Sequence, residues 1–129
     1  MVSFVQTLFQ SERQWERVLK QKTLCIDFDD TLRSRWDDSP IVGAAEALSK
    51  LKQEGYRIVI GSARINPKLW GDLVHFRIKD IKNWLDEHNI PYDDIVVYKP
   101  AAALYIDDKG YRFEGDWEKT YNDVRNLVG

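Results

Sequence analysis

Four short apolar runs constrain the fold of this 129-residue chain more than any other feature of its sequence. They are Leu24–Ile26, Ile58–Ile60, Ile95–Tyr98 and Leu104–Ile106. Each run is continuous rather than alternating and is rich in β-branched residues, as expected for strands buried on both faces of a parallel sheet. Segments with helical spacing of apolar residues separate or follow them. The pattern predicts an α/β fold, a Rossmann-like three-layer sandwich with a mainly parallel central sheet.

Three helices are expected in this core. The stripe Ala44–Leu51 is followed by Gly55, a residue that commonly caps helix C-termini. A second stripe lies within 78–85 and ends before Asn89 and Pro91. The third lies within 117–128, where Asp116 is placed to cap the N-terminus.

The length suits a single domain over residues 1–129. No internal repeat and no linker rich in Pro, Gly or Ser divides the chain. Residues 1–22 are predicted to form an N-terminal helical extension, since Ser11 and Gln14 have the spacing of a capping box. Residues 23–129 are predicted to form the core domain.

Composition excludes several classes of partner. Nineteen basic and 21 acidic residues give a formal net charge of −2, so neither nucleic acid nor a polybasic membrane contact is expected. No run approaches the roughly 20 apolar residues that span a bilayer, and the N-terminus lacks signal-peptide features. The single cysteine, Cys25, cannot form an internal disulfide. A cytoplasmic location is therefore predicted.

Polar side chains follow each apolar run where the predicted strand ends. The segments are Asp27–Thr31, Gly61–Arg64, Lys99–Pro100 and Asp107–Lys109. Because ligands bind beyond the carboxyl ends of parallel strands, we expect these groups to converge at one edge of the sheet. Crowded carboxylates repel one another unless a cation lies between them, and their hard oxygen atoms suit Mg²⁺. A divalent metal beside a lysine and a hydroxyl forms a site for a phosphoryl group.

Each feature also has a simpler structural explanation, because Asp pairs are common in turns and Lys-Pro steps in surface loops. Their joint order after four predicted strands favours a site. An EF-hand loop starting at Asp27 is excluded, since it would require Gly in place of Leu32 and Glu in place of Asp38. The glycine motifs of P-loops and dinucleotide folds do not occur.

Three segments resemble the four motifs of the haloacid dehalogenase (HAD) superfamily of phosphohydrolases. They are CIDFDDTL, IVIGSAR and VYKPAAALYIDD, of which the last holds the third and fourth motifs. The resemblance extends over about Thr23–Asp116 and is strongest for small members without a cap domain. It implies a HAD-like catalytic core over 23–129 and Mg²⁺-dependent phosphomonoester hydrolysis through an aspartyl-phosphate intermediate. The implied substrate is a phosphorylated metabolite or a nucleotide.

The resemblance also implies a role for each matching residue. Asp27 would attack phosphorus, and Asp29 would protonate the leaving oxygen and then activate water. Ser62 would donate a hydrogen bond to a phosphoryl oxygen, and Lys99 would neutralise developing charge.

The Mg²⁺ ion would be held by Asp27, the backbone carbonyl of Asp29 and Asp107. Asp108 would bind it directly or through water. The sequence departs from the family pattern at Asp30, where the family often has Gly. Asp tolerates the left-handed conformation, so this departure does not threaten the fold.

The spacing of the motifs leaves no room for a cap domain, because each gap on either side of Ser62 holds one helix and its loops. The site is therefore expected to be accessible to solvent and closed only by loops, by a neighbouring subunit or by a large substrate. The sequence does not decide whether the chain self-associates. Arg64, Lys68 and Trp70 are candidate substrate-binding residues. A solvated start of a helix would explain these three residues almost as well.

Two other functions remain as alternatives. A phosphoacceptor receiver domain of a signalling relay shares the length, an acidic pair after the first strand and a Lys-Pro step. It places its phosphoacceptor Asp after a middle strand, however, and here Ser62 follows the second run. A nucleic-acid end phosphatase uses the same chemistry, but the acidic net charge disfavours it.

Overall fold

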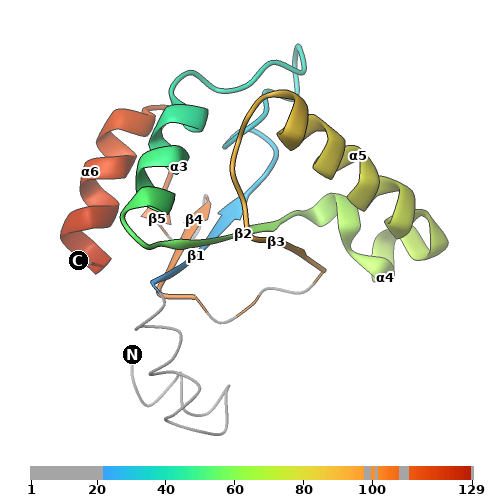
Figure 1. Cartoon of the computed structure of the whole chain (residues 1–129). Coiled ribbons are helices and arrows are strands. Elements are labelled where there is room, and N and C mark those ends of the chain that lie inside the picture. Colours follow the sequence, from blue (N-terminus) through green and yellow to red (C-terminus); the bar gives the residue numbers. More distant parts are fainter. Residues whose placement is uncertain (1–21, 98–99, 101, 108–110, 129) are drawn as a thin grey trace, which may run out of the picture.

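The computed structural model describes residues 22–97, 100, 102–107 and 111–128. Its centre is a five-stranded sheet in which every neighbouring pair is parallel, in the order β3-β2-β1-β4-β5 (Figure 1). The strands are β1 (Thr23–Asp27), β2 (Arg57–Gly61), β3 (Asp94–Val96), β4 (Leu104–Asp107) and β5 (Tyr111–Arg112). The predicted α/β fold with a Rossmann-like parallel sheet is confirmed. Strand β5 is an addition to the prediction, since two residues are too few to show a period.

The three predicted helices are present as α3 (Ala44–Gln53), α5 (Val74–Glu87) and α6 (Trp117–Val128). Gly55 and Asn89 follow α3 and α5 with left-handed φ angles of 92° and 57°. The Asp116 carboxylate accepts a hydrogen bond from the Lys119 backbone N–H at 3.0 Å, as an N-terminal cap should. The helix predicted in 1–22 lies outside the described residues, except for Lys22. No described helix has both the length and the apolar content needed to cross a bilayer.

The segment 65–71 lies in the gap after Ser62, for which one helix and its loops were expected, and it is helical rather than a simple loop. It contains the end of the 3₁₀ helix η1 (Ala63–Ile65), the short α4 (Pro67–Trp70) and the start of the 3₁₀ helix η2 (Gly71–Leu73). The Asn66 side chain accepts a hydrogen bond from the Lys68 backbone N–H at 2.9 Å, and Pro67 occupies the first helical position. Both are strong helix-start signals, which explains the extra turn.

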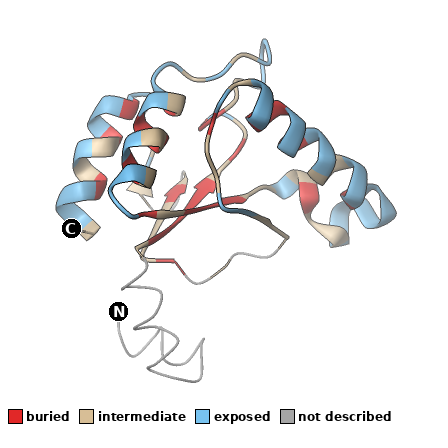
Figure 2. Cartoon of the chain, in the orientation of Figure 1, coloured by how far each residue is buried: buried red, intermediate tan, exposed pale blue. Residues whose placement is uncertain are grey.

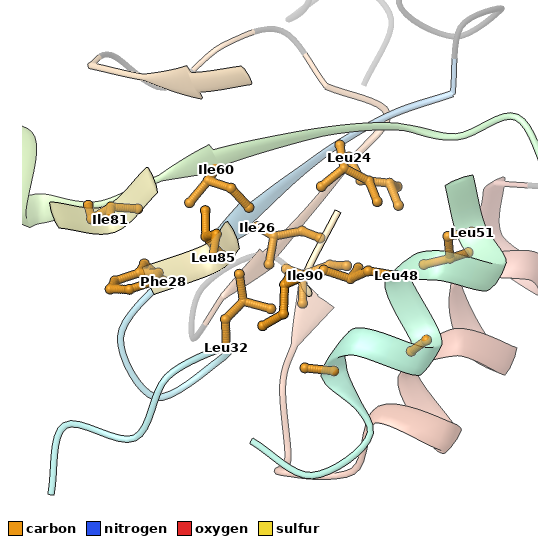
Figure 3. Close-up of a cluster of buried hydrophobic side chains, with 14 of the residues drawn as sticks. Leu24, Ile26, Phe28, Leu32, Leu48, Leu51, Ile60, Ile81, Leu85 and Ile90 are labelled. Carbon is orange, nitrogen blue, oxygen red and sulfur yellow. The ribbon is translucent and has the colours of Figure 1, made fainter. Parts of the chain in front are cut away.

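One large core lies between the sheet and these helices. Leu24 and Ile26 from β1 point into it with Ile60 from β2 (Figure 3). Helices α3, α5 and α6 supply the opposing residues, and Figure 2 shows buried positions both in the central strands and along these helices. The intervening strand residue Cys25 instead belongs to a second cluster, with Val59 and Ala102. The three long described helices thus share one face of the sheet. The central strands β1 and β2 are buried on both faces, as predicted, whereas β3, β4 and β5 are more exposed.

Asp93 joins the start of β3 to β2. Its carboxylate accepts hydrogen bonds from the Ile58 backbone N–H at 2.7 Å and from Lys52 Nζ at 2.5 Å. Burial by itself raises the pKa of this carboxyl, but these two donors and the charge of Lys52 outweigh burial and lower the pKa below its usual value. The ionised form therefore stabilises the fold above the unfolded pKa of about 4, and this contribution is lost as the pH falls through the lowered folded pKa.

Asp93→Asn is therefore expected to lower the free energy of unfolding at pH 7 by about 1–2 kcal/mol, because the two charge-assisted hydrogen bonds are weakened. The difference from the wild type should be smaller at an acidic pH below the lowered folded pKa, where the wild-type carboxyl is protonated as well. Urea unfolding at the two pH values measures this, with Asp80→Asn on the exposed face of α5 as control. A difference of equal size at both pH values would contradict the assignment.

Candidate functional site

The order of the strands defines where a ligand would bind. The chain runs outward from β1 through β2 to β3, then returns to the other side of β1 with β4 and β5. The connections therefore reverse direction between β1 and β4. In open α/β sheets, ligands bind at such a switch point, beyond the carboxyl ends of the strands.

Three predicted site residues lie at this edge. Asp27 is the last residue of β1 and stands in register with Gly61, the last residue of β2, so Ser62 follows directly beside it. Ile26 stands in register with Ile106 of β4, so the next residue, Asp107, ends its strand alongside Asp27. The backbone thus brings three groups, remote in sequence, to the ends of three neighbouring strands.

Two further predicted residues cannot be placed. Lys99 and Asp108 both lie outside the described residues, so their positions remain predictions. Strand β3 ends at Val96, which stands in register with Gly61. The chain therefore leaves β3 towards Lys99 from the same edge of the sheet.

The Asp29 carboxylate is held between two arginines. One oxygen, Oδ1, accepts a hydrogen bond from Arg33 Nη1 at 2.8 Å, and the other, Oδ2, accepts one from Arg64 Nε at 2.8 Å. The Asp29 side chain is 21% exposed, so these ion pairs are partly shielded from water. Each carboxylate oxygen therefore accepts one hydrogen bond from a cation and keeps a lone pair for a further contact.

Arg33 also ties the loop after β1 together. Besides Asp29, its guanidinium forms an ion pair with Asp38, and the side chain is only 14% exposed. Burial lowers the pKa of Arg33, but the hydrogen bonds and charges of Asp38 and Asp29 outweigh this and raise it. The Asp38 carbonyl in turn accepts a hydrogen bond from Trp84 Nε1 of α5 at 3.0 Å. Sequence reasoning missed Arg33, although the closely spaced opposite charges of residues 29–38 were a signal.

The buried Phe28 ring lies next to both arginines that pair with Asp29. The ring is 1% exposed and meets Trp84 edge-on, with 5.3 Å between ring centroids. The guanidinium carbons of Arg33 and Arg64 lie 5.9 and 5.8 Å from the centroid of the Phe28 ring. The buried Phe28 ring restricts water on one side of both cations, and cation–π attraction adds to the ion pairs.

Asp30 does adopt the left-handed conformation, with φ 60°. Its carboxylate accepts a hydrogen bond from the Arg35 backbone N–H at 3.0 Å and pairs with Arg35 Nε at 2.5 Å. The extra acidic residue is therefore neutralised within its own loop.

Ser62 caps the 3₁₀ helix η1. Its Oγ accepts a hydrogen bond from the Arg64 backbone N–H at 3.1 Å. A hydroxyl that accepts in this way keeps its own proton, so Ser62 can still donate to a phosphoryl oxygen.

Of the other substrate-binding candidates, Trp70 is engaged within the protein. Its Nε1 donates a hydrogen bond to the Ala63 carbonyl at 3.1 Å, and the Arg77 guanidinium lies 3.6 Å from the ring centroid. Lys68 is exposed, and its backbone N–H belongs to the cap of α4. The structure thus brings Arg64 to Asp29, whereas it gives Trp70 a packing role beside η1.

The described acidic groups fit part of the predicted magnesium site. Asp27 and Asp107 present carboxylates at the ends of neighbouring strands, and such hard oxygen donors suit Mg²⁺. Among the described residues, no three His, Cys, Asp or Glu side chains form a group that could hold a metal. The third carboxylate of the predicted set, Asp108, lies outside the described residues, and its fourth donor is the Asp29 backbone carbonyl rather than a side chain.

A cavity of about 670 Å³ lies elsewhere, between α3 and α6. Its lining includes Glu46, Asp116 and Glu118 and none of the predicted site residues. An acidic lining does not suit a phosphate, so we place the candidate site at the strand ends.

Comparison with known proteins found two similar chains, and no family model matches the sequence. A protein of Chlorobaculum tepidum described as a "Putative 5'(3')-deoxyribonucleotidase" is 34% identical over 76 residues, which are 53% of this chain. The chain spans about a third of that relative, 34% of its length. A conserved protein from Bacteroides thetaiotaomicron has the same fold, with a TM-score of 0.60 and 23% identity over 81% of this chain and 89% of its own.

Proposed function

We propose that this protein is a Mg²⁺-dependent phosphomonoester hydrolase of the HAD type that acts on a nucleotide or another small phosphorylated metabolite. The observation that carries the proposal is the placement of Asp27, Ser62 and Asp107 on three neighbouring strand ends, around the switch point of the sheet. The similarity to a protein named as a deoxyribonucleotidase supports a nucleotide substrate.

In the proposed reaction, a carboxylate oxygen of Asp27 forms a bond to phosphorus as the bond to the ester oxygen breaks. Asp29 gives a proton to the leaving oxygen. It then takes a proton from the water that attacks the aspartyl phosphate, which restores Asp27 and releases inorganic phosphate. Ser62 and Lys99 would bind the phosphoryl oxygens and offset their negative charge.

Magnesium would be held by Asp27, Asp107, Asp108 and the backbone carbonyl of Asp29, and when bound it would neutralise charge on the phosphoryl group. An open site without a cap would suit substrates whose leaving group extends into solvent. The loop after β1, which Arg33 secures, and the segment 63–73 would then supply the contacts to that group.

The sheet order disfavours the receiver alternative. Receiver domains have the order 2-1-3-4-5, in which the third strand lies beside the first. Here β4 lies beside β1 instead, and β3 is an outermost strand of the sheet.

The test is phosphate release from deoxyribonucleoside and ribonucleoside 5'- and 3'-monophosphates, with p-nitrophenyl phosphate as a general ester. We expect many turnovers with Mg²⁺, loss of activity on addition of EDTA and recovery when Mg²⁺ is restored. Absence of release from every ester would contradict the proposal. Transfer of a single, long-lived phosphoryl group to the protein would instead support the receiver domain.

A further inference from the structure

We infer that Arg64 is a phosphate-binding residue that exchanges partners. When the substrate binds, Arg64 releases the Asp29 carboxylate and binds the phosphoryl group of the substrate instead. This inference rests on the proposed function and assigns a role to one residue of the same site. It follows from the pairing of Asp29, from the unequal fixation of its two arginines and from the position of Arg64 beside Ser62.

The pairing of Asp29 explains why an exchange would serve the proposed reaction. Its two oxygens accept hydrogen bonds from Arg33 and Arg64, both at 2.8 Å. A carboxylate that is to pass a proton to a leaving group needs one oxygen within hydrogen-bond reach of that group. Moving one of the two arginines away would clear the approach to one of these oxygens when the substrate binds.

Arg33 is the more firmly held of the two. It pairs with two carboxylates, Asp29 and Asp38, and its side chain is 14% exposed. The Arg64 side chain is 33% exposed, and Asp29 is its only carboxylate partner in the described part of the chain. Releasing Arg64 breaks one ion pair instead of two and requires less rearrangement of the loop.

Arg64 also lies where a phosphate would arrive. It belongs to the same 3₁₀ turn as Ser62, and its backbone N–H donates to Ser62 Oγ. Ser62 in turn follows the strand beside Asp27. A guanidinium is suited to phosphate because its planar donors match two phosphate oxygens at once. The incoming dianion therefore competes with Asp29 for the same cation.

Inorganic phosphate at a fixed Mg²⁺ concentration, titrated by calorimetry, tests the exchange without relying on turnover. Arg64→Ala is expected to weaken phosphate binding about tenfold or more, and Arg64→Lys to recover part of the loss. Arg57→Ala is the matched control, since Arg57 begins the same strand β2 at the opposite edge of the sheet. Its phosphate affinity should equal that of the wild type.

Asp29→Asn is expected to change the phosphate affinity in the opposite direction. It removes the competing charge while keeping the shape of the side chain, so phosphate binding should become about two- to fivefold tighter, the worth of a partly exposed ion pair. In the Arg64→Ala background the same change should have little effect, because the cation it would release is absent.

Three results would overturn the inference. The first is a wild-type protein that binds no phosphate. The second is an Arg64→Ala variant with unchanged phosphate affinity, which would mean that Arg64 only positions Asp29. Equal tightening by Asp29→Asn with and without Arg64 would show simple removal of negative charge. A wild type that binds phosphate through Arg64 but hydrolyses no ester would refute the proposed function and leave this inference standing.

Discussion

Asp27→Asn is expected to reduce phosphate release by about 10³-fold or more, which corresponds to at least about 4 kcal/mol of transition-state stabilisation. The amide has nearly the same shape as the carboxylate, but its oxygen is a poor nucleophile, so no aspartyl phosphate can form. Asp27 ends the central strand β1, whose neighbours β2 and β4 fix its position from both sides. The loss should therefore reflect chemistry rather than a displaced backbone.

The measurement combines steady-state rates with acid-quenched mass spectrometry. The wild type should show a fraction of chains heavier by one phosphoryl group, and Asp27→Asn should show none. Asp80→Asn on the exposed face of α5 removes the same charge away from the strand ends and should keep the wild-type rate. Wild-type activity in Asp27→Asn, or a phosphoryl group trapped on another residue, would refute the assigned nucleophile.

The arrangement of strand ends around the site is predictable because it depends on few structural features. Continuous apolar runs must be buried on both faces, and strands of a parallel sheet end at a common edge. Register then places Asp27, Ser62 and Asp107 side by side. None of this requires knowledge of side-chain conformations, and it therefore follows from the order of residues alone.

The partners of Asp29 could not be predicted in the same way. Its contact with Arg33 depends on a loop in which Asp30 and Asp38 adopt left-handed φ angles of 60° and 66°. Periodicity carries no information about such turns. The contact with Arg64 joins two loops from different strands, so it depends on how η1 is oriented. The Asn66-Pro67 step did carry a local signal for a helix start, and it marks where prediction could have gone further.

The conformation of the loop after β1 matters because it determines where Asp29 points, and two buried anchors hold this loop. Leu32 is fully buried between the sheet and the helices (Figure 3). Trp117 at the start of α6 donates a hydrogen bond from Nε1 to the Thr31 carbonyl at 2.8 Å. Thr31 comes two residues after Asp29, so α6 helps to position the proposed acid and base although it contributes no group to the site.

Trp117→Ala is expected to lower the free energy of unfolding by about 3–5 kcal/mol, the largest stability loss of the variants considered. Trp117 is 1% exposed, and the centroid of its ring lies 5.0 Å from that of the Phe113 ring. Its removal leaves a large void and an unpaired carbonyl at Thr31. A loss of this size is a substantial part of the total stability of a domain this small.

Two further variants separate packing from hydrogen bonding. Trp117→Phe keeps much of the ring but loses the donor to Thr31, so it should cost about 1–3 kcal/mol and lower kcat by loosening the loop. Trp36→Ala makes the same change on an 88% exposed side chain and should stay within about 0.5 kcal/mol of the wild type. Urea unfolding measures all three. If Trp117→Ala were no more destabilising than Trp36→Ala, α6 could not be the anchor of the loop that carries Asp29.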